Sequence, residues 1–260
     1  MPLSIRIHAL PALLLAAAAL LLPRTARAGE AVQALLDGYA SVPQLTCELR
    51  RDIQAPDGDT VRFLSRIWFQ RPDRLHAENL SPMKRRTVCD GATLRQYTEG
   101  LPRGFSRPVA ELEGEALTNL RMLPGSNSNW LEPLRDLPET DLPPADGAPS
   151  ARRVACTAPG KPYAVLAFDA DNRWIRLEMY SAADCANRLL LATFTDFAEV
   201  APSVWLPRRQ TIDLSMDGAV RTETVRLDNL SATAPIPAAM FDADSFFPGV
   251  TFTDSFDKMF

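Results

Sequence analysis

The residues that most often perform catalysis are scarce in this sequence. The chain has 260 residues and two histidines, His8 and His76. His8 lies in a segment that we expect to be removed, so a triad of nucleophile, base and orienting acid would depend on His76. That histidine stands beside Arg74 and Glu78 on a short predicted strand, where we expect it to lie on the surface. The sequence contains none of the fixed-spacing motifs of serine hydrolases, zinc proteases and phosphate-binding loops.

Acidic residues offer no clearer chemistry. Asp169 and Asp171 lie in a predicted hairpin turn, where carboxylates shape the backbone. That turn lacks the glycine and the distal glutamate of a calcium-binding loop. Two carboxylates can hydrolyse a substrate without a metal, and the sequence neither excludes nor recommends this reaction. We therefore expect no catalytic residues, no metal site and no cofactor.

Residues 1–28 have the pattern of a secretory signal peptide. A weakly basic start leads into an apolar run over residues 9–22, and Ala26-Arg27-Ala28 is a small-residue cleavage site. Because the run is too short to span a bilayer, a signal peptide is favoured over a retained membrane anchor. We expect cleavage near Ala28, export to the periplasm, and a mature chain that forms one domain over residues 29–260.

The charge of the mature chain limits its partners. Cleavage would remove three arginines and no acidic residue, so the formal net charge would move from -4 to -7. Nucleic acids are bound by basic surfaces that neutralise phosphates, and we expect no nucleic-acid partner for so acidic a chain. No second apolar run in the sequence is long enough to cross a membrane.

Four cysteines, Cys47, Cys89, Cys156 and Cys185, remain after cleavage. They include no C-x-x-C pair and match no zinc-binding spacing. In an exported chain disulfides are favoured over free thiols, and four cysteines allow three pairings. Our prediction is that Cys156 pairs with Cys185 and Cys47 with Cys89.

The periodicity of the sequence predicts a mainly β fold. Residues 31–39 have the spacing of a short amphipathic helix, and residues 109–137 suggest two further helices, the second of them interrupted by Pro133. A proline-rich connection continues to residue 149. Strands at hairpin spacing fill the rest and predict a meander. The predicted strands cover residues 44–52, 61–70, 75–79, 85–89, 93–97, 152–156, 164–169, 174–180, 189–198, 206–214 and 221–230.

Several segments carry a recognisable order of turns and strands. A strand ends in arginine and proline, a short second strand follows, and an Asp-Gly turn then opens an aromatic strand. The end of the chain has a phenylalanine-containing turn before a final short strand. These segments are Arg71-Pro72, Ser81-Pro82, Asp90-Gly91, Trp205-Leu206-Pro207 and 241–250. Together they resemble the LolA-type family of outer-membrane lipoprotein carriers, over most of the mature chain.

The resemblance implies a strongly curved antiparallel sheet, an incomplete β-barrel, with helices as a lid over its concave face. It also implies a periplasmic carrier that shields the acyl chains of lipoproteins, or of a related lipid, and hands them on toward the outer membrane. The expected partners are this cargo, an inner-membrane donor transporter and an outer-membrane acceptor, and the carrier is expected to be a monomer. The proline-rich connection and the cysteines differ from the simplest carriers and leave the cargo open.

The resemblance assigns a role to Arg71. It matches the arginine before proline that, in the family, latches the lid by hydrogen bonds across the cavity mouth and helps ligand to leave. The alternative is a solvated arginine at a strand end. The residues expected to line the cavity or the lid contact, each of which could instead be ordinary core, are Phe63, Ile67, Phe69, Leu75, Leu190, Phe194 and Trp205.

Two other functions stay open on the sequence. Relatives of this fold also act as lipid-sensing regulators, usually with an additional C-terminal domain, and a structural accessory of an export machine is the third hypothesis. The chain stops at Phe260, soon after its closing segment, which favours the stand-alone carrier.

Overall fold

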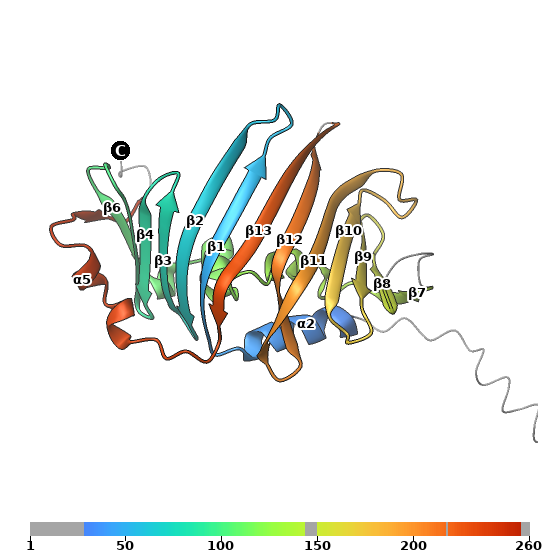
Figure 1. The fold of residues 1–260 in the computed structure, drawn as a ribbon, viewed down its shortest axis with the longest axis horizontal. Coiled ribbons are helices and arrows are strands. Elements are labelled where there is room, and N and C mark those ends of the chain that lie inside the picture. Colours follow the sequence, from blue (N-terminus) through green and yellow to red (C-terminus); the bar gives the residue numbers. More distant parts are fainter. Residues whose placement is uncertain (1–28, 144–149, 217, 256–260) are drawn as a thin grey trace, which may run out of the picture.

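A single curved sheet of 14 strands runs through the protein (Figure 1). The computed structural model describes residues 29–143, 150–216 and 218–255. The strand order is β14-β6-β5-β4-β3-β2-β1-β13-β12-β11-β10-β9-β8-β7, so β14 and β7 are the two free edges and the sheet does not close. The short strand β14 is parallel to β6, and all the other neighbours are antiparallel. The mainly β, incompletely closed architecture predicted from the sequence is therefore confirmed.

The strands agree with the predicted meander and add three short ones. Their bounds are β1 Gln44–Gln54, β2 Thr60–Gln70, β3 Arg74–Ser81, β4 Arg85–Asp90, β5 Thr93–Thr98, β6 Gly104–Pro108, β7 Glu139–Leu142, β8 Arg152–Cys156, β9 Tyr163–Phe168, β10 Trp174–Tyr180, β11 Arg188–Ala201, β12 Val204–Met216, β13 Ala219–Ser231 and β14 Phe252–Thr253. Strands β6, β7 and β14 were not predicted from the sequence. The predicted signal peptide lies outside the described residues.

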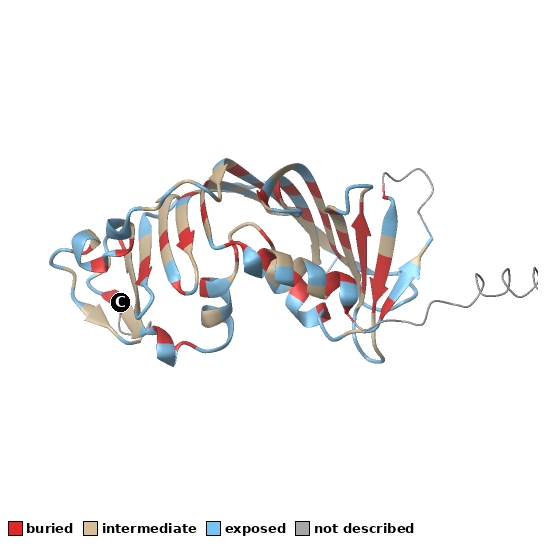
Figure 2. Ribbon diagram, turned by 90° about the horizontal axis from the view of Figure 1, so that it is seen from below, coloured by how far each residue is buried: buried red, intermediate tan, exposed pale blue. Residues whose placement is uncertain are grey.

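Short helices complete the fold. Their bounds are α2 Glu30–Ser41, η1 Val109–Glu111, α3 Gly114–Arg121, α4 Ser128–Leu131, η2 Glu132–Leu134, η3 Ala238–Phe241 and α5 Ala243–Phe246. Helix α2 and the segment from η1 to η2 lie inside the curve of the sheet (Figure 2). We call this side the concave face, the helices on it the lid, and the opposite side the convex face.

The hydrophobic core is divided between the two faces. The main cluster joins α2, α4 and η2 to strands β1, β2 and β8–β13. A second cluster, with Cys89 and Leu120, packs α3 on the same face near β4. A third, with Val88 and Phe247, packs α5 against the other face of β4. Because Val88 and Cys89 are adjacent, their side chains point to opposite faces of the strand, and the C-terminal segment therefore covers the convex face there.

The predicted disulfides are wrong, because all four cysteines are free thiols. Cys47 on β1 and Cys89 on β4 are separated by β2 and β3, so roughly 14 Å of sheet lies between them, whereas a disulfide requires Cα atoms within about 7 Å. Cys156 is buried on β8, whereas Cys185 is exposed in the connection between β10 and β11. Burial raises the pKa of Cys47 and Cys156 to about 12 and that of Cys89 to about 11, so these three thiols stay protonated.

Candidate functional site

The concave face is apolar where the lid covers it. Three of the predicted cavity residues, Phe69, Leu190 and Phe194, are buried there, with exposed fractions of 0%, 5% and 2%. Ile67 and Leu75 are half-buried and pack against the same core. Alternate residues of a strand point to the same face of the sheet, which explains why these five side chains share the concave face. They lie together at the contact between sheet and lid.

The other two predicted residues lie outside this contact. Phe63 is half-buried and faces Arg51 near the free end of the β1–β2 hairpin. Trp205 lines a cleft of about 570 Å³ between α2, the β9–β10 turn and the β11–β12 turn. The guanidinium of Arg173 lies 5.6 Å from the ring centroid of Trp205. Because five charged side chains line this cleft, it is poorly suited to an acyl chain.

The lid helices bury one apolar side each. In α2 the apolar residues recur at helical spacing, so they form a stripe that faces the sheet. Helix α4 and the turn η2 each add one leucine that is at most 2% exposed. The buried residues of α2, α4 and η2 are Ala31, Val32, Leu36, Tyr39, Leu131 and Leu134.

Arg71 connects the ends of two lid helices to the end of β2. Its Nη2 donates to the carbonyl oxygen of Tyr39 and its Nε to that of Val42, both at 3.1 Å, at the C-terminus of α2. Its Nη1 donates to the carbonyl oxygen of Arg121, at 3.2 Å, at the C-terminus of α3. Helix C-termini leave carbonyl groups without intrahelical partners and attract a cation. Burial lowers the pKa of Arg71 and the charge of Asp73 opposes this shift, and an arginine stays charged in either case.

Asp73 also holds α3, through the side chain of Arg121. Asp73 is 9% exposed, and its carboxylate accepts hydrogen bonds from Nε of Arg121 at 2.7 Å and from Nη2 at 3.1 Å. This hydrogen bond raises the pKa of Arg121. The turn between β2 and β3 therefore binds the main chain of Arg121 through Arg71 and its side chain through Asp73.

The opposite end of α2 is held by Glu139 of the edge strand β7. This buried carboxylate accepts hydrogen bonds from the backbone amides of Ala31, at 2.8 and 3.0 Å, and of Val32, at 2.9 Å. These amides belong to the first turn of α2 and have no partner within the helix, so a carboxylate stabilises them. Gly29 precedes the helix with φ +59° and a Cβ there would lie 2.1 Å from the carbonyl oxygen of Arg135, so only glycine fits.

The middle of the lid is held by Gln210 of β12. This side chain is 1% exposed. It accepts a hydrogen bond from Asn127 at 2.8 Å and donates one to the carbonyl oxygen of Gly125 at 2.7 Å. Sequence reasoning missed Glu139 and Gln210, because each bonds to residues more than 80 positions away and no local motif marks them.

His76 is fully buried, so the expected surface position is wrong. Its Nδ1 lies 2.8 Å from the carbonyl oxygen of Met240, and the ring centroids of Phe246 and Trp68 lie 4.4 and 5.0 Å from its own. Its Nε2 is 3.6 Å from a carboxylate oxygen of Glu78. Burial is the main cause that lowers the pKa of His76. The side chain holds the C-terminal segment on the convex face and lies away from the lid.

Among the described residues, no group of three or more His, Cys, Asp or Glu side chains is placed to hold a metal ion. In the same parts of the chain, no helix is both long enough and apolar enough to cross a membrane.

The similarity of this protein to known proteins lies in its architecture. No family model matches the sequence, and no match is found among curated proteins. A LolA superfamily protein from Nitrosomonas europaea matches with a TM-score of 0.51 and 11% identity, over 85% of this chain and 100% of that chain. A DUF1329 family protein from Desulfovibrio piger matches with a TM-score of 0.51 and 12% identity, over 83% of this chain and 96% of that chain. Identities this low establish the fold alone, and the protein has a LolA-like fold.

Proposed function

We propose that this protein is a periplasmic carrier of acylated cargo. The cargo is the acyl chains of a lipoprotein, or of a related lipid, which bind the concave face when the lid helices move aside. In this proposal the signal peptide is cleaved near Ala28. The mature monomer receives its cargo from an inner-membrane donor transporter and hands it to an outer-membrane acceptor.

The observation that carries the proposal is the way in which the apolar face is covered. The lid packs apolar side chains on the face, but its ends and middle are fastened by three polar side chains, Arg71, Glu139 and Gln210. Hydrogen bonds can be exchanged for bonds to water when the lid opens, whereas an uncovered apolar face needs another apolar partner. Acyl chains are such a partner.

The energies are compatible with reversible loading. Each methylene group removed from water contributes about 0.8 kcal/mol, so a chain of about twelve gains roughly 10 kcal/mol. The buried leucines of the lid return toward water as the chain enters, at about 1.5–3 kcal/mol for each large side chain. The lid therefore offsets much of the gain, and cargo can leave for a second apolar site.

The proposal is tested by purifying the protein from periplasm without detergent, extracting it with organic solvent and analysing the extract by mass spectrometry. A carrier should yield acylated lipid or lipopeptide in near-stoichiometric amount. The delipidated protein should also take up a fluorescent fatty acid. Protein that yields no lipid and takes up no probe would refute the carrier and leave the sensor and accessory hypotheses.

A further inference from the structure

A charged cluster lies at the end of the sheet where β1, β2, β12 and β13 extend farthest from α2 (Figure 1). Glu223 is 3% exposed at its centre. Arg51 donates from Nε at 2.9 Å and from Nη2 at 2.5 Å to one carboxylate oxygen of Glu223. Arg221 donates from Nη2 at 2.7 Å to the other oxygen. Two guanidinium groups thus share one carboxylate, and the cluster keeps one positive charge.

Strand register places the cluster on the concave face. Arg51 is opposite Val225, and Glu223 is opposite Ile212. Both partners belong to the core beneath the lid. Residues directly opposite on neighbouring strands point to the same face, and Arg221 shares it because it lies two residues from Glu223 on β13. The cluster therefore continues the face that the lid covers.

Apolar side chains surround the cluster. Ile53 is opposite Glu223, and Leu214 is opposite Arg221. Val61 is 45% exposed, while Phe63, opposite Arg51, is half-buried. The surroundings therefore combine apolar side chains with a localised charge, which matches a molecule that has an apolar chain and a charged end. These apolar residues are Ile53, Val61, Phe63 and Leu214.

The arginines of this face retain donors for a second anion. The side chains of Arg51 and Arg221 are 43% and 39% exposed. Among the described residues nothing accepts a hydrogen bond from Nε of Arg221, although this atom is buried. Farther along the face, Arg85 is opposite Asn79. On this side of the strands Arg51, Arg221 and Arg85 outnumber Glu223, while the nearby β1–β2 turn carries Asp57 and Asp59.

We propose that Arg51, Glu223 and Arg221 form a subsite for the anionic headgroup of the cargo, a phosphate or a carboxylate, whose acyl chains extend beneath the lid. This inference rests on the proposed carrier function and names its substrate class, an anionic amphiphile. Guanidinium groups bind phosphate and carboxylate oxygens with two parallel hydrogen bonds. Glu223 holds the two arginines in place and weakens the attraction enough for release.

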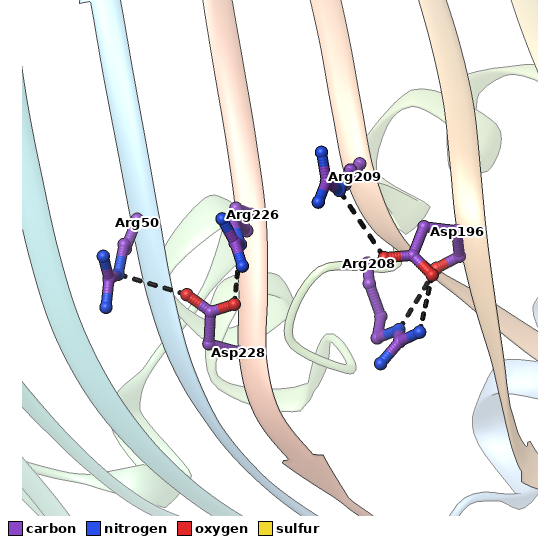
Figure 3. A network of polar contacts seen from close by, with 6 residues as sticks. All are labelled: Arg50, Asp196, Arg208, Arg209, Arg226 and Asp228. Atoms are coloured by element: carbon purple, nitrogen blue, oxygen red, sulfur yellow. Dashed lines mark hydrogen bonds and ion pairs between the residues drawn. The ribbon is translucent and has the colours of Figure 1, made fainter.

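The convex face supplies matched controls. Arg50 and Arg226 both pair with Asp228 there, at 3.1 and 2.7 Å (Figure 3). Arg50→Gln and Arg51→Gln remove the same charge from adjacent residues of β1, on opposite faces. Arg226→Gln provides the corresponding control on β13.

The experiment compares two single-chain lipids with the same acyl chain, lysophosphatidylglycerol (anionic) and monoacylglycerol (uncharged, without phosphate), by calorimetric titration at concentrations below aggregation. We expect the anionic lipid to bind about tenfold tighter, the ratio that one charge-assisted hydrogen bond supplies. Arg51→Gln and Arg221→Gln should each abolish this preference and leave the affinity for the uncharged lipid unchanged. Glu223→Gln should increase the preference, because both arginines are then free to bind the headgroup.

Each result separates the subsite from the carrier function. Equal affinities for the two lipids in the parent, or the same loss in Arg50→Gln as in Arg51→Gln, would overturn the subsite and leave the carrier. Binding of neither lipid would overturn both proposals. Inorganic phosphate alone is the last probe, and if it bound as tightly as the anionic lipid, the site would belong to free phosphate. Arg51→Lys, which keeps the charge, should retain part of the preference even where Arg51→Gln folds poorly.

Discussion

Replacing Arg71 by leucine should loosen the lid and leave the sheet intact. The variant removes three hydrogen bonds, to the carbonyl oxygens of Tyr39, Val42 and Arg121. The guanidinium is only partly buried, so each bond contributes about 1 kcal/mol after exchange with water. The closed lid should therefore lose about 2–3 kcal/mol, which raises the opening equilibrium about 30- to 150-fold.

Hydrogen–deuterium exchange measures this opening directly. Amides in residues 36–42 and 118–122, at the ends of α2 and α3, should exchange faster by about this factor, because local opening controls their exchange. Amides paired between β9 and β10 should keep the rates of the parent, since no bond of Arg71 reaches them. Arg71→Lys should recover only part of the protection, because an ammonium group cannot present the guanidinium fork to three carbonyl groups.

Arg66→Leu is the control for this experiment, since Arg66 lies on β2, the strand that ends just before Arg71, and pairs with Glu48 at 3.4 Å, away from the lid. Unchanged protection of both helix ends in Arg71→Leu would refute the latch. A uniform loss of protection across the sheet would mean that Arg71 supports the whole fold. The closed lid competes with cargo for the concave face, so a weaker latch should also raise cargo affinity and slow its release, by up to the same factor.

Three further predictions concern other side chains. Because burial lowers the pKa of His76, its neutral form stabilises the fold fully above about pH 6.5 and this stability is lost as the pH falls below that value. Urea midpoints between pH 7.5 and 5 should therefore fall more steeply in the parent than in His76→Asn. Glu139→Gln should cost about 1–2 kcal/mol and speed exchange at the first turn of α2, because the amides of Ala31 and Val32 lose a charged acceptor; unchanged exchange there would contradict this. Alkylation of the native protein should label Cys185 and not the three buried cysteines, and reductant should leave the labelling unchanged.

The local features of the fold could be predicted from the sequence. Alternation of apolar residues marked β2, and the Asp90-Gly91 turn marked a hairpin, because these signals depend on neighbours along the chain. The short strand β7 was missed, since its few residues stand in a proline-rich stretch. Its place in the sheet comes from pairing with β8 rather than from any pattern of its own.

Long-range contacts could not be predicted. His76 was expected on the surface beside two charged residues, and it is buried because the C-terminal segment, about 160 residues later, packs Met240 and Phe246 over it. The predicted pairing of Cys47 with Cys89 failed for a local reason, because β1 to β4 are neighbours in chain order and three strand spacings separate the two cysteines. The contact that no local signal could supply is the pairing of β1 with β13, which joins distant parts of the chain.

The order of the strands also explains why the protein has a lid. Strands β6 and β7 are consecutive along the chain, yet β6 lies near one edge of the sheet and β7 forms the other. Twelve strand spacings separate them, roughly 58 Å measured along the sheet. The connection, residues 109–138, contains η1, α3, α4 and η2, and helical segments advance only about 1.5 Å per residue. Such a connection crosses the shorter chord inside the curve more readily than the longer path outside it. The helices therefore lie across the concave face. The hairpin ends of β1, β2, β12 and β13 extend beyond that chord, so the lid does not cover the charged cluster around Glu223.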